Sequence, residues 1–398
     1  MFLPVKTIVF TALLYFLSSN TVCAKVLEVG QGKEYSSLQD AATKAKAGDT
    51  ILIRKGVYKG GNFIVNLKGT ANAWITICGA ANEEVIFRGG SEAIHLSDPE
   101  YIIIKGLIFE DQTGNSVNID DGTSYESPAH HIIIENCKWV RINATGNNDE
   151  LKISGLEDFV IKKCWFNNGS PGGSLIDMVG CHNGIVEENV FENAGSNSIQ
   201  AKGGSKDILI YRNKFLNGGQ RAINIGGSTG LAYFRPKGVN YEASSIRVYS
   251  NIIVGGIASV AFVGALNSEV INNTIIQPQR WAIRILQETK SSEFLLCSNN
   301  IFRNNIVVTE STQPAINIGS NTDPASFTFS NNLWFNPKNS SWTGPDTPVK
   351  EVNQLLNVNP LLSENTFQLK ANSPAISKGY FSVQPVLDFS GKPFTKKR

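Results

Sequence analysis

Four polar residues recur at near-constant intervals in the middle of the chain, and together they could carry chemistry. They are Lys152, Asp177, Gln200 and Asn224, each set between apolar residues in a short segment that runs into Gly. The intervals are close to 25 residues, which is typical of one coil in a stacked repeat. If the coils stack in register, these side chains form one column on the outer face of a sheet, about 4.8 Å apart. Lys202, two residues after Gln200, then lies on the same face.

A lysine surrounded by amide and guanidinium groups suits the removal of a proton next to a carboxylate. In β-elimination from a uronate polymer, a base takes the proton at C5 and the bond to the leaving oxygen at C4 breaks. The proton is acidic enough only when the adjacent carboxylate is neutralised by nearby positive groups. We therefore predict that Lys202 is the base, that Arg221 assists it and that Asp177 orients it. The residues predicted to bind the substrate are Lys152, Gln200, Asn224, Arg235, Tyr233, Arg280, Trp281 and Arg284.

The same residues are compatible with other functions. A glycoside hydrolase would use Asp177 with Asp149 or Glu150, because carboxylates on adjacent coils lie roughly 5–10 Å apart, a range that spans retaining and inverting mechanisms. A non-catalytic protein would bind a glycan without turnover, using Trp281 or Arg284. Alternating charges on a solvated sheet could also be simple ion pairs. The sequence favours the elimination but leaves these alternatives open.

The elements that must position these residues are short apolar runs that end near Asn or Cys. Cys164, Asn189 and Asn213 mark three such runs, at steps of 25 and 24 residues, and Asn251 and Asn273 mark later ones, 22 apart. Coils of this length with several short strands indicate an all-β chain folded as a right-handed parallel β-helix. Asn tolerates the left-handed backbone of a sharp turn, and stacked Asn side chains can form a hydrogen-bonded ladder. No linker divides the chain, so we predict one domain over residues 25–398.

The N-terminal region carries two separate signals. Residues 1–24 read as a signal peptide with cleavage after Ala24, which predicts a secreted or periplasmic protein. No later stretch is long and apolar enough for a transmembrane helix. Residues 36–48 predict a helix that Ser36 and Gln39 cap as a capping box and that Gly48 ends. Such a helix would cover the open end of the solenoid core.

Two insertions interrupt the coil period beside the column. Residues 227–244 form a long loop that holds Tyr233 and Arg235, and we expect it to wall a substrate groove beside Asn224. Extra residues also occur at 287–293. Alignment of the later strands extends the column to Phe262 and Arg284, with Phe262 pointing outward.

Composition restricts the partners. The 398 residues carry a formal net charge of +2, and the basic residues are spread along the chain, so we expect no nucleic-acid partner. The four His and six Cys show no metal-ligand spacing. We expect a monomer whose partner is an acidic polysaccharide.

The opening SLQDAATKAKAGDTILIRKGVYKG, the coil pattern and an outward Lys followed one coil later by Arg resemble the β-helical polysaccharide lyases of the alginate lyase and chondroitinase B type. The resemblance covers most of the chain in architecture. It implies that Lys202 is the base and that Arg221, slightly early for the family position, assists as acid. It also implies calcium bound by acidic residues just before the Lys, where this chain has Gly195-Ser196-Asn197-Ser198 and no acidic residue. A sister group would hold the substrate carboxylate with Gln200, Asn224 or Arg284 instead.

Overall fold

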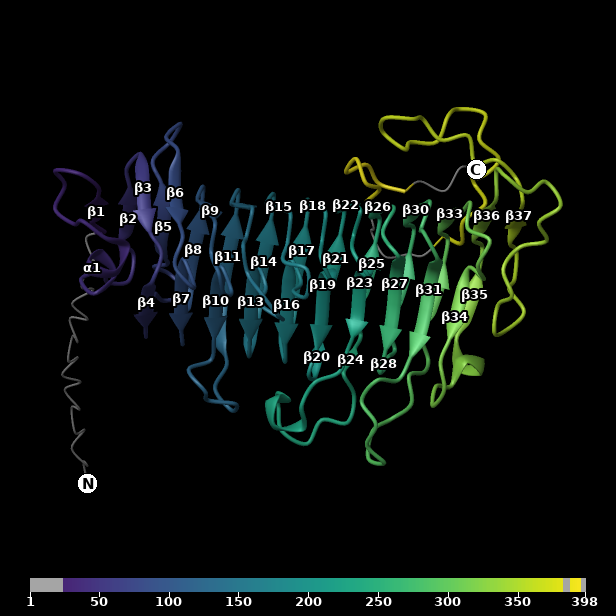
Figure 1. The fold of residues 1–398 in the computed structure, drawn as a ribbon, viewed down its shortest axis with the longest axis horizontal. Coiled ribbons are helices and arrows are strands. Elements are labelled where there is room, and N and C mark those ends of the chain that lie inside the picture. The colour runs from purple at the N-terminus through teal and green to yellow at the C-terminus, as the bar shows by residue number, and fades with distance from the viewer. Residues whose placement is uncertain (1–23, 382–386, 395–398) are drawn as a thin grey trace, which may run out of the picture.

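The chain winds into a parallel β-helix of three long sheets, as the coil period predicted. The computed structural model describes residues 24–381 and 387–394. Within the described residues every strand pair named below is parallel, and each of the middle coils adds a strand to all three sheets. Figure 1 shows the resulting elongated stack, with the coils succeeding one another from the N-terminal to the C-terminal end. The predicted fold class, a right-handed parallel β-helix, is confirmed. The predicted signal peptide lies almost wholly outside the described residues.

The first sheet, sheet A, has 15 strands. Its main path is β1 (Val26–Val29), β2 (Thr50–Ile53), β5 (Ile75–Gly79), β8 (Glu100–Lys105), β11 (Ala129–Glu135), β14 (Leu156–Lys162), β17 (His182–Glu187), β21 (Leu209–Tyr211), β25 (Arg247–Tyr249), β29 (Glu269–Ile271), β32 (Ile301–Arg303) and β35 (Thr328–Ser330). The short strands β20 (Ser205–Lys206), β24 (Ala243–Ser244) and β28 (Ala265–Leu266) form a side branch that pairs with β17.

The second sheet, sheet B, has 12 strands. They are β3 (Gly56–Lys59), β6 (Val85–Arg88), β9 (Ile108–Glu110), β12 (Lys138–Val140), β15 (Trp165–Asn167), β18 (Val190–Glu192), β22 (Lys214–Leu216), β26 (Ile252–Val254), β30 (Thr274–Ile276), β33 (Ile306–Val308), β36 (Leu333–Phe335) and β37 (Leu355–Leu356).

The third sheet, sheet C, carries the predicted column and has 10 strands. They are β4 (Asn62–Val65), β7 (Ile94–Ser97), β10 (Val117–Asp120), β13 (Leu151–Ser154), β16 (Ile176–Val179), β19 (Asn197–Lys202), β23 (Arg221–Gly226), β27 (Ala258–Val263), β31 (Trp281–Leu286) and β34 (Ile316–Ile318).

Inward residues of the three sheets form one continuous core. Aromatic rings from successive coils stack in it, with centroids 4.3 Å apart for Trp139 and Phe166 and 5.0 Å apart for Phe166 and Phe191. A parallel repeat brings equivalent side chains to the same place in every coil, so identical residue types pack on one another. This stacking fixes the register of the coils and therefore of the polar residues outside.

The N-terminal helix is present but shorter than predicted. α1 (Leu38–Ala42) begins after Ser37, whose hydroxyl accepts from the backbone N–H of Asp40 at 3.1 Å. The cap is therefore Ser37 rather than Ser36, and the helix ends at Ala42, well before Gly48. Its apolar side packs against the hydrophobic core at the N-terminal end.

An asparagine ladder closes one corner of successive coils, as predicted. The side-chain oxygen of Asn251 accepts from the backbone N–H of Asn213 at 2.8 Å, and Asn273 accepts in the same way from Asn251 at 2.9 Å. The ladder residues themselves do not adopt the left-handed conformation. The residue before each one does, for example Arg212 and Ser250 with φ near 55°. The ladder therefore satisfies buried backbone groups, while the preceding residue makes the turn.

Three loops, within residues 121–128, 227–242 and 287–296, project from the same edge of sheet C (Figure 1). Short 3-10 helices, η1 (Leu231–Tyr233) and η2 (Pro324–Ser326), lie in connecting segments. Within the described residues, no helix has the length and apolarity needed to cross a membrane.

Candidate active site

The strand register of sheet C places the predicted polar residues in one row. Lys152 pairs with Asp177, Asp177 with Gln200, and Gln200 with Asn224. We call this row the polar column. The column was predicted from the repeat alone, and the register confirms its geometry. In the same row the next strands add Ala261 and then Arg284.

Phe262 does not belong to the column, and this prediction was wrong. The residue paired with Asn224 is Ala261, one position earlier, and Phe262 is fully buried in the core, where its ring meets that of Phe327 edge-on. Every residue of β27 is buried, so alternation of polar and apolar residues gave no guide to its register. A shift of one residue moves each side chain to the opposite face of a sheet.

Asp177 is shared by two lysines from the neighbouring coils. Its Oδ2 accepts from Lys152 Nζ in a short contact, and its Oδ1 lies 3.2 Å from Lys202 Nζ. Only 3% of the Asp177 side chain is exposed, whereas Lys152 and Lys202 are 23% and 19% exposed. The carboxylate thus lies beneath two ammonium groups, and a molecule approaching the column meets the cations first.

The buried carboxylates of the site differ in their titration. Burial opposes ionisation of Asp177, but Lys152 and Lys202 outweigh it and hold the pKa of this carboxyl below its usual value. Burial and the nearby Asp177 charge instead raise the pKa of Asp149 to about 7, although Asp149 lies 3.6 Å from Lys152 Nζ. Glu150 is fully enclosed, neither carboxyl oxygen has a hydrogen-bond partner, and burial raises its pKa far above the usual range. Asp177 is therefore the charged member of this group.

Arg221 reaches the column from the opposite direction to Lys202. Its Nη1 donates to the side-chain oxygen of Asn224 at 3.2 Å, and its guanidinium pairs with Glu288 of the 287–296 loop. Lys202 Nζ donates to Gln200 at 3.4 Å. Gln200 and Asn224 are paired neighbours, so the two cationic groups come to adjacent positions of the column although their Cα atoms lie far apart along the strands.

The chain beyond β23 closes over Lys202. A Cβ atom on Gly227 would lie 2.5 Å from Gln200 Nε2 and 3.2 Å from the Lys202 side chain, so a larger residue here would require these side chains to shift. The backbone at Gly227 therefore lies close to the Gln200 amide and to the aliphatic part of the Lys202 side chain.

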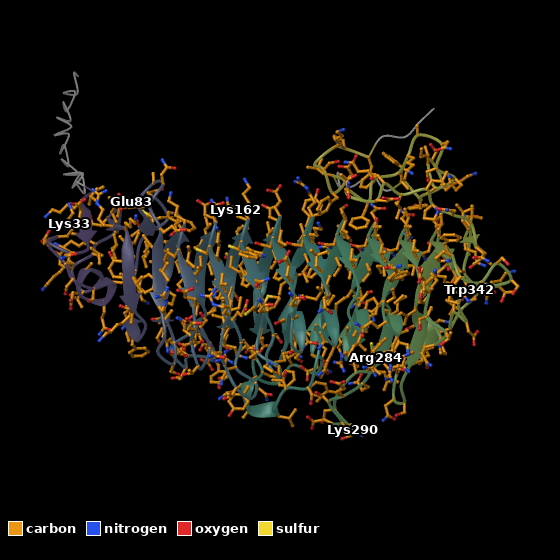
Figure 2. All side chains as sticks on the ribbon, turned by 45° about the horizontal axis from the view of Figure 1, so that its top comes forward. Lys33, Glu83, Lys162, Arg284, Lys290 and Trp342 are labelled. Atoms are coloured by element: carbon orange, nitrogen blue, oxygen red, sulfur yellow. The ribbon has the colours of Figure 1, made fainter. Side chains whose placement is uncertain are left out.

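Arg284, Trp281 and Arg280 form a separate cluster on the C-terminal side of the column. The Arg284 guanidinium lies 4.4 Å from the centroid of the Trp281 ring, and that of Arg280 lies 5.4 Å from it. Arg284 Nε also donates to Asn317 at 3.0 Å. In Figure 2, Arg284 lies on sheet C above the loop that carries Lys290. The cluster adds positive charge and an aromatic face about 14 Å along the sheet from Lys202.

Arg235 and Tyr233 lie on the 227–242 loop but serve different contacts. Arg235 is 8% exposed and directs its guanidinium to Asp121, with Nη2 donating to Oδ1 at 3.1 Å. It fits only because Gly180 carries no side chain, since a Cβ there would lie 2.4 Å from that of Arg235. Arg235 therefore fastens the loop to the 121–128 loop and does not face the column. Tyr233 is 61% exposed at the loop surface.

Residues that the repeat analysis missed extend the column toward the N-terminus. His95 and Asn118 pair with each other and continue the row from Lys152. His95 Nε2 lies 2.6 Å from Asp120 and Nδ1 lies 3.1 Å from Glu92. Burial works against the charged ring, but these two carboxylates raise the pKa of His95 to about 9. The larger gap between Asn118 and Lys152 hid this continuation in the sequence.

The donor set around Lys202 does not fit the calcium ion that the family resemblance implies. Calcium takes six to eight oxygen ligands, with carboxylates prominent among them. Here Asp177 and Asp149 both face the Lys152 ammonium, and residues 195–198 bring no carboxylate. Within the part of the chain that the structure describes, no cluster of three His, Cys, Asp or Glu residues could hold a metal ion. A lysine occupies the position between the carboxylates that a cation would need.

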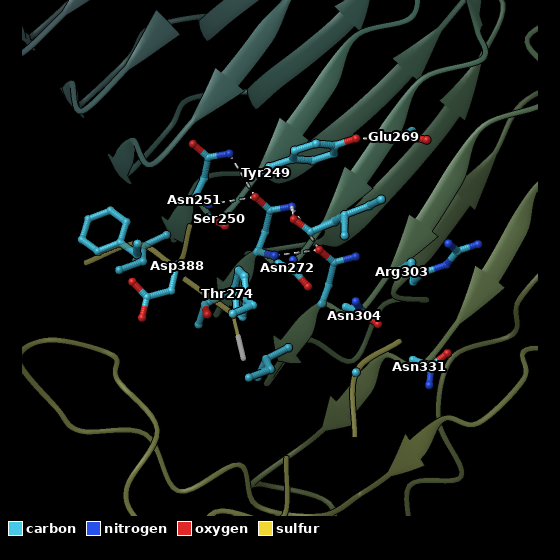
Figure 3. Close-up of a pocket in the computed structure, with 18 of the residues that line it drawn as sticks. Tyr249, Ser250, Asn251, Glu269, Asn272, Thr274, Arg303, Asn304, Asn331 and Asp388 are labelled. Atoms are coloured by element: carbon cyan, nitrogen blue, oxygen red, sulfur yellow. Dashed lines mark hydrogen bonds between the residues drawn. The ribbon is translucent and has the colours of Figure 1, made fainter. Parts of the chain in front are cut away.

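A large cavity among the described residues lies elsewhere. Its volume is about 1650 Å³, and it lies between the turns that follow sheet A and the C-terminal segment. Figure 3 shows Asn251 of the ladder, the Tyr249–Glu269 pair and Arg303 on one side, and Asp388 of the C-terminal segment on the other. None of the predicted site residues lines it, so the column is not part of this cavity.

Comparison with known proteins agrees with this architecture. Residues 33–188 match the chondroitinase B family. The predicted resemblance to β-helical polysaccharide lyases is thereby confirmed. The chondroitinase B match includes Lys152 and Asp177 but ends before Lys202 and Arg221. No curated protein matches the chain in sequence.

Several solved structures share the fold. An alginate lyase from a Paenibacillus species is 16% identical, with 84% of this chain and 99% of that chain covered and a TM-score of 0.51. A pectate lyase is 15% identical, with 92% and 96% covered and a TM-score of 0.53. An endo-xylogalacturonan hydrolase from Aspergillus tubingensis is 10% identical, with 83% and 100% covered and a TM-score of 0.55. At these identities the likeness concerns the fold, and it includes both lyases and hydrolases.

Proposed function

We propose that the protein is a polysaccharide lyase that cleaves a uronate-containing chain by β-elimination at the polar column. The observation that carries this proposal is the difference in exposure at the column. Its cationic side chains are partly exposed to solvent, whereas its carboxylates are buried beneath them. Lys152, Lys202 and Arg221 keep between 15% and 23% of their side chains exposed, whereas Asp177 is 3% exposed. An anionic sugar therefore meets the groups that its carboxylate needs.

Lys202 is the proposed base and Arg221 its partner. Lys202 would first release its ammonium proton to solvent, and the neutral amine would then remove the C5 proton. The electron pair left at C5 would form the C4–C5 double bond as the C4–O bond breaks and its electrons go to the leaving oxygen. Arg221 would stabilise or protonate the leaving oxygen from the adjacent coil. Asp177 would orient Lys202, because its Oδ1 lies 3.2 Å from Nζ of Lys202 on the next strand.

Neutralisation of the substrate carboxylate is assigned to the chain's own side chains. Lys152 already lies between Asp149 and Asp177, and the raised pKa of Asp149 reduces the negative charge that would oppose an acidic substrate. Gln200, Asn224 and Arg284 add amide and guanidinium donors in the same row. No step of the proposed reaction passes through calcium. Trp281 and Tyr233 supply rings for contact with sugar faces.

A glycoside hydrolase is the second candidate, and one observation favours it. The pKa values of Asp149 and Asp177 are pushed in opposite directions, the pattern expected for an acid and base pair. Against it, both carboxyl groups lie below the lysines and are at most 5% exposed. Since the acid must reach a glycosidic oxygen, we rank elimination first.

Alginate, pectate and glycosaminoglycans should each be incubated with the protein, with and without a chelator, and followed by near-ultraviolet absorbance and by new reducing ends. Elimination predicts that both signals rise together on one acidic polymer and that the chelator has no effect. New reducing ends without absorbance would show that the protein is a glycoside hydrolase, with Asp177 as a catalytic residue. Binding without either signal would favour a glycan-binding protein. Loss of binding in Trp281→Ala or Arg284→Ala would then show that the glycan contacts these residues. In each case we propose a secreted or periplasmic monomer.

A further inference from the structure

A single buried carboxylate, Glu242, connects the two sides of the candidate site. It lies at the end of the 227–242 loop and is fully enclosed. Oε2 accepts from the backbone N–H of Gly203 at 2.9 Å and from the Thr229 hydroxyl at 2.7 Å. Oε1 accepts from the backbone N–H of Thr229 at 2.8 Å and from the Thr289 hydroxyl in a short contact. All four donors are neutral groups.

One of these donors is a chain neighbour of the proposed base, and another is a chain neighbour of the residue that pairs with Arg221. Gly203 directly follows Lys202, and Thr289 directly follows Glu288, which pairs with Arg221. The backbone carbonyl oxygen of Glu242 also accepts a hydrogen bond from the backbone N–H of Gly204 at 2.9 Å. Hence the segment after Lys202 and the loop that holds Arg221 are tied to one side chain.

The Glu242 carboxyl has no Lys, Arg or His partner in the described part of the chain, so its four hydrogen bonds alone offset its burial. A buried ionised group is tolerated only when its oxygens are satisfied, and each lost donor leaves part of the desolvation cost uncompensated. Side chains placed by such a satisfied network are held more rigidly than side chains placed by loop packing alone. Both loops project from the same edge of sheet C, where one carboxylate can reach them (Figure 1).

We propose that Glu242 is a positioning residue that sets the relative placement of Lys202 and Arg221. It does not touch the column itself, so it acts through Gly203 and through Thr289 and Glu288. The inference rests on the proposed function. It predicts that loss of the carboxylate lowers turnover while the substrate-binding residues Arg284 and Trp281 keep their places.

The test is Glu242→Gln, with Glu351→Gln as a matched control. An amide has the same shape, but its NH₂ group cannot accept from two of the four donors. Glu351 is also buried and accepts from the backbone and side chain of Asn332 and from Trp334, at the C-terminal end and away from the column. Both variants lose a buried carboxylate whose oxygens are hydrogen-bonded. They differ in whether that carboxylate lies near the proposed catalytic residues.

On the polymer that the wild type cleaves, Glu242→Gln should lower kcat by about 100-fold with little change in KM, because an error of about 1 Å in placement costs this much. Glu351→Gln should lower the unfolding temperature but leave kcat near that of the wild type. Thr289→Val, which removes one donor, should lower kcat by a smaller factor in the same direction. If Glu242→Gln keeps kcat, or if both glutamine variants lose it equally, the positioning role is overturned.

Hydrogen exchange separates this result from a failure of the proposed function. Peptides that span Gly203, Thr229 and Thr289 should exchange faster in Glu242→Gln than in the wild type, and not in Glu351→Gln. A wild type that releases no unsaturated product from any uronate polymer would refute the lyase assignment. Unchanged exchange at these three places would refute the role of Glu242 whether or not the wild type is active.

Discussion

Lys202 and Asp177 stand on neighbouring strands, β19 and β16, with Nζ 3.2 Å from Oδ1. The carboxylate also holds Lys152 from the strand on its other side. One buried anion therefore organises two partly exposed cations from separate coils. The functional proposal depends on this arrangement, because it gives the column its positive outer surface.

Asp177→Asn should destabilise the protein strongly and reduce any activity. Removal of one partner from a buried ion pair leaves an uncompensated charge and typically costs about 3–5 kcal/mol. Denaturant unfolding measures the loss. The control is Asp207→Asn, since the Lys206–Asp207 pair is exposed and should contribute less than about 1 kcal/mol. Equal effects of the two substitutions would show that Asp177 has no special structural role.

Asp149 should make stability depend on pH between about 4 and about 7. Its pKa is raised to about 7 in the folded protein, above the usual carboxyl value of about 3.9, so the folded state binds the extra proton. The contribution of Asp149 protonation to the unfolding free energy is thus fully present below about pH 4 and is lost as pH rises through about 7. The difference in unfolding free energy between the wild type and Asp149→Asn should fall across this range. A difference that stays constant, or that rises, would contradict the assigned protonation.

Arg221→Lys should lower kcat although the charge is kept. A lysine cannot contact Glu288 and Asn224 at once with the planar geometry of a guanidinium. We expect a decrease of about 10- to 100-fold in kcat at unchanged thermal stability. Arg303→Lys on sheet A, whose guanidinium lies over Tyr380, is the matched control and should retain activity. Full activity in Arg221→Lys would remove Arg221 from the mechanism.

The asparagine ladder should contribute heavily to stability. Asn251 donates to the backbone oxygen of Ile210 at 2.9 Å and accepts from Asn213, all inside the protein. Asn251→Ala leaves buried groups unsatisfied at about 1–3 kcal/mol each. Asn143→Ala, at an exposed residue whose backbone is not left-handed, should change the unfolding free energy by less than about 0.5 kcal/mol. Comparable losses in the two variants would refute the structural role of the ladder.

The part of the site built from regular coils could be predicted from the sequence. Lys152, Asp177 and Gln200 aligned correctly because their coils differ little in length and each residue lies between inward apolar neighbours. The same reasoning failed at Phe262, because a wholly buried strand carries no alternation to fix its register.

The remaining contacts depend on insertions, where the period gives no guide. Arg235 was expected to face a substrate, but its loop folds back onto Asp121. Glu288 and Glu242 were missed for the same reason, since the paths of their loops are set by long-range hydrogen bonds. Only the folded loops bring these carboxylates to Arg221 and Gly203.

The most direct test of the central claim is the mass and near-ultraviolet absorbance of the products made by the wild type and by Lys202→Ala. We expect wild-type products to carry an absorbing double bond and to be one water lighter than hydrolysis products. Lys202→Ala, still folded because Lys152 retains Asp177, should form these products about 100- to 10,000-fold more slowly. Products that have gained a water, or a Lys202→Ala variant as fast as the wild type, would contradict elimination by Lys202.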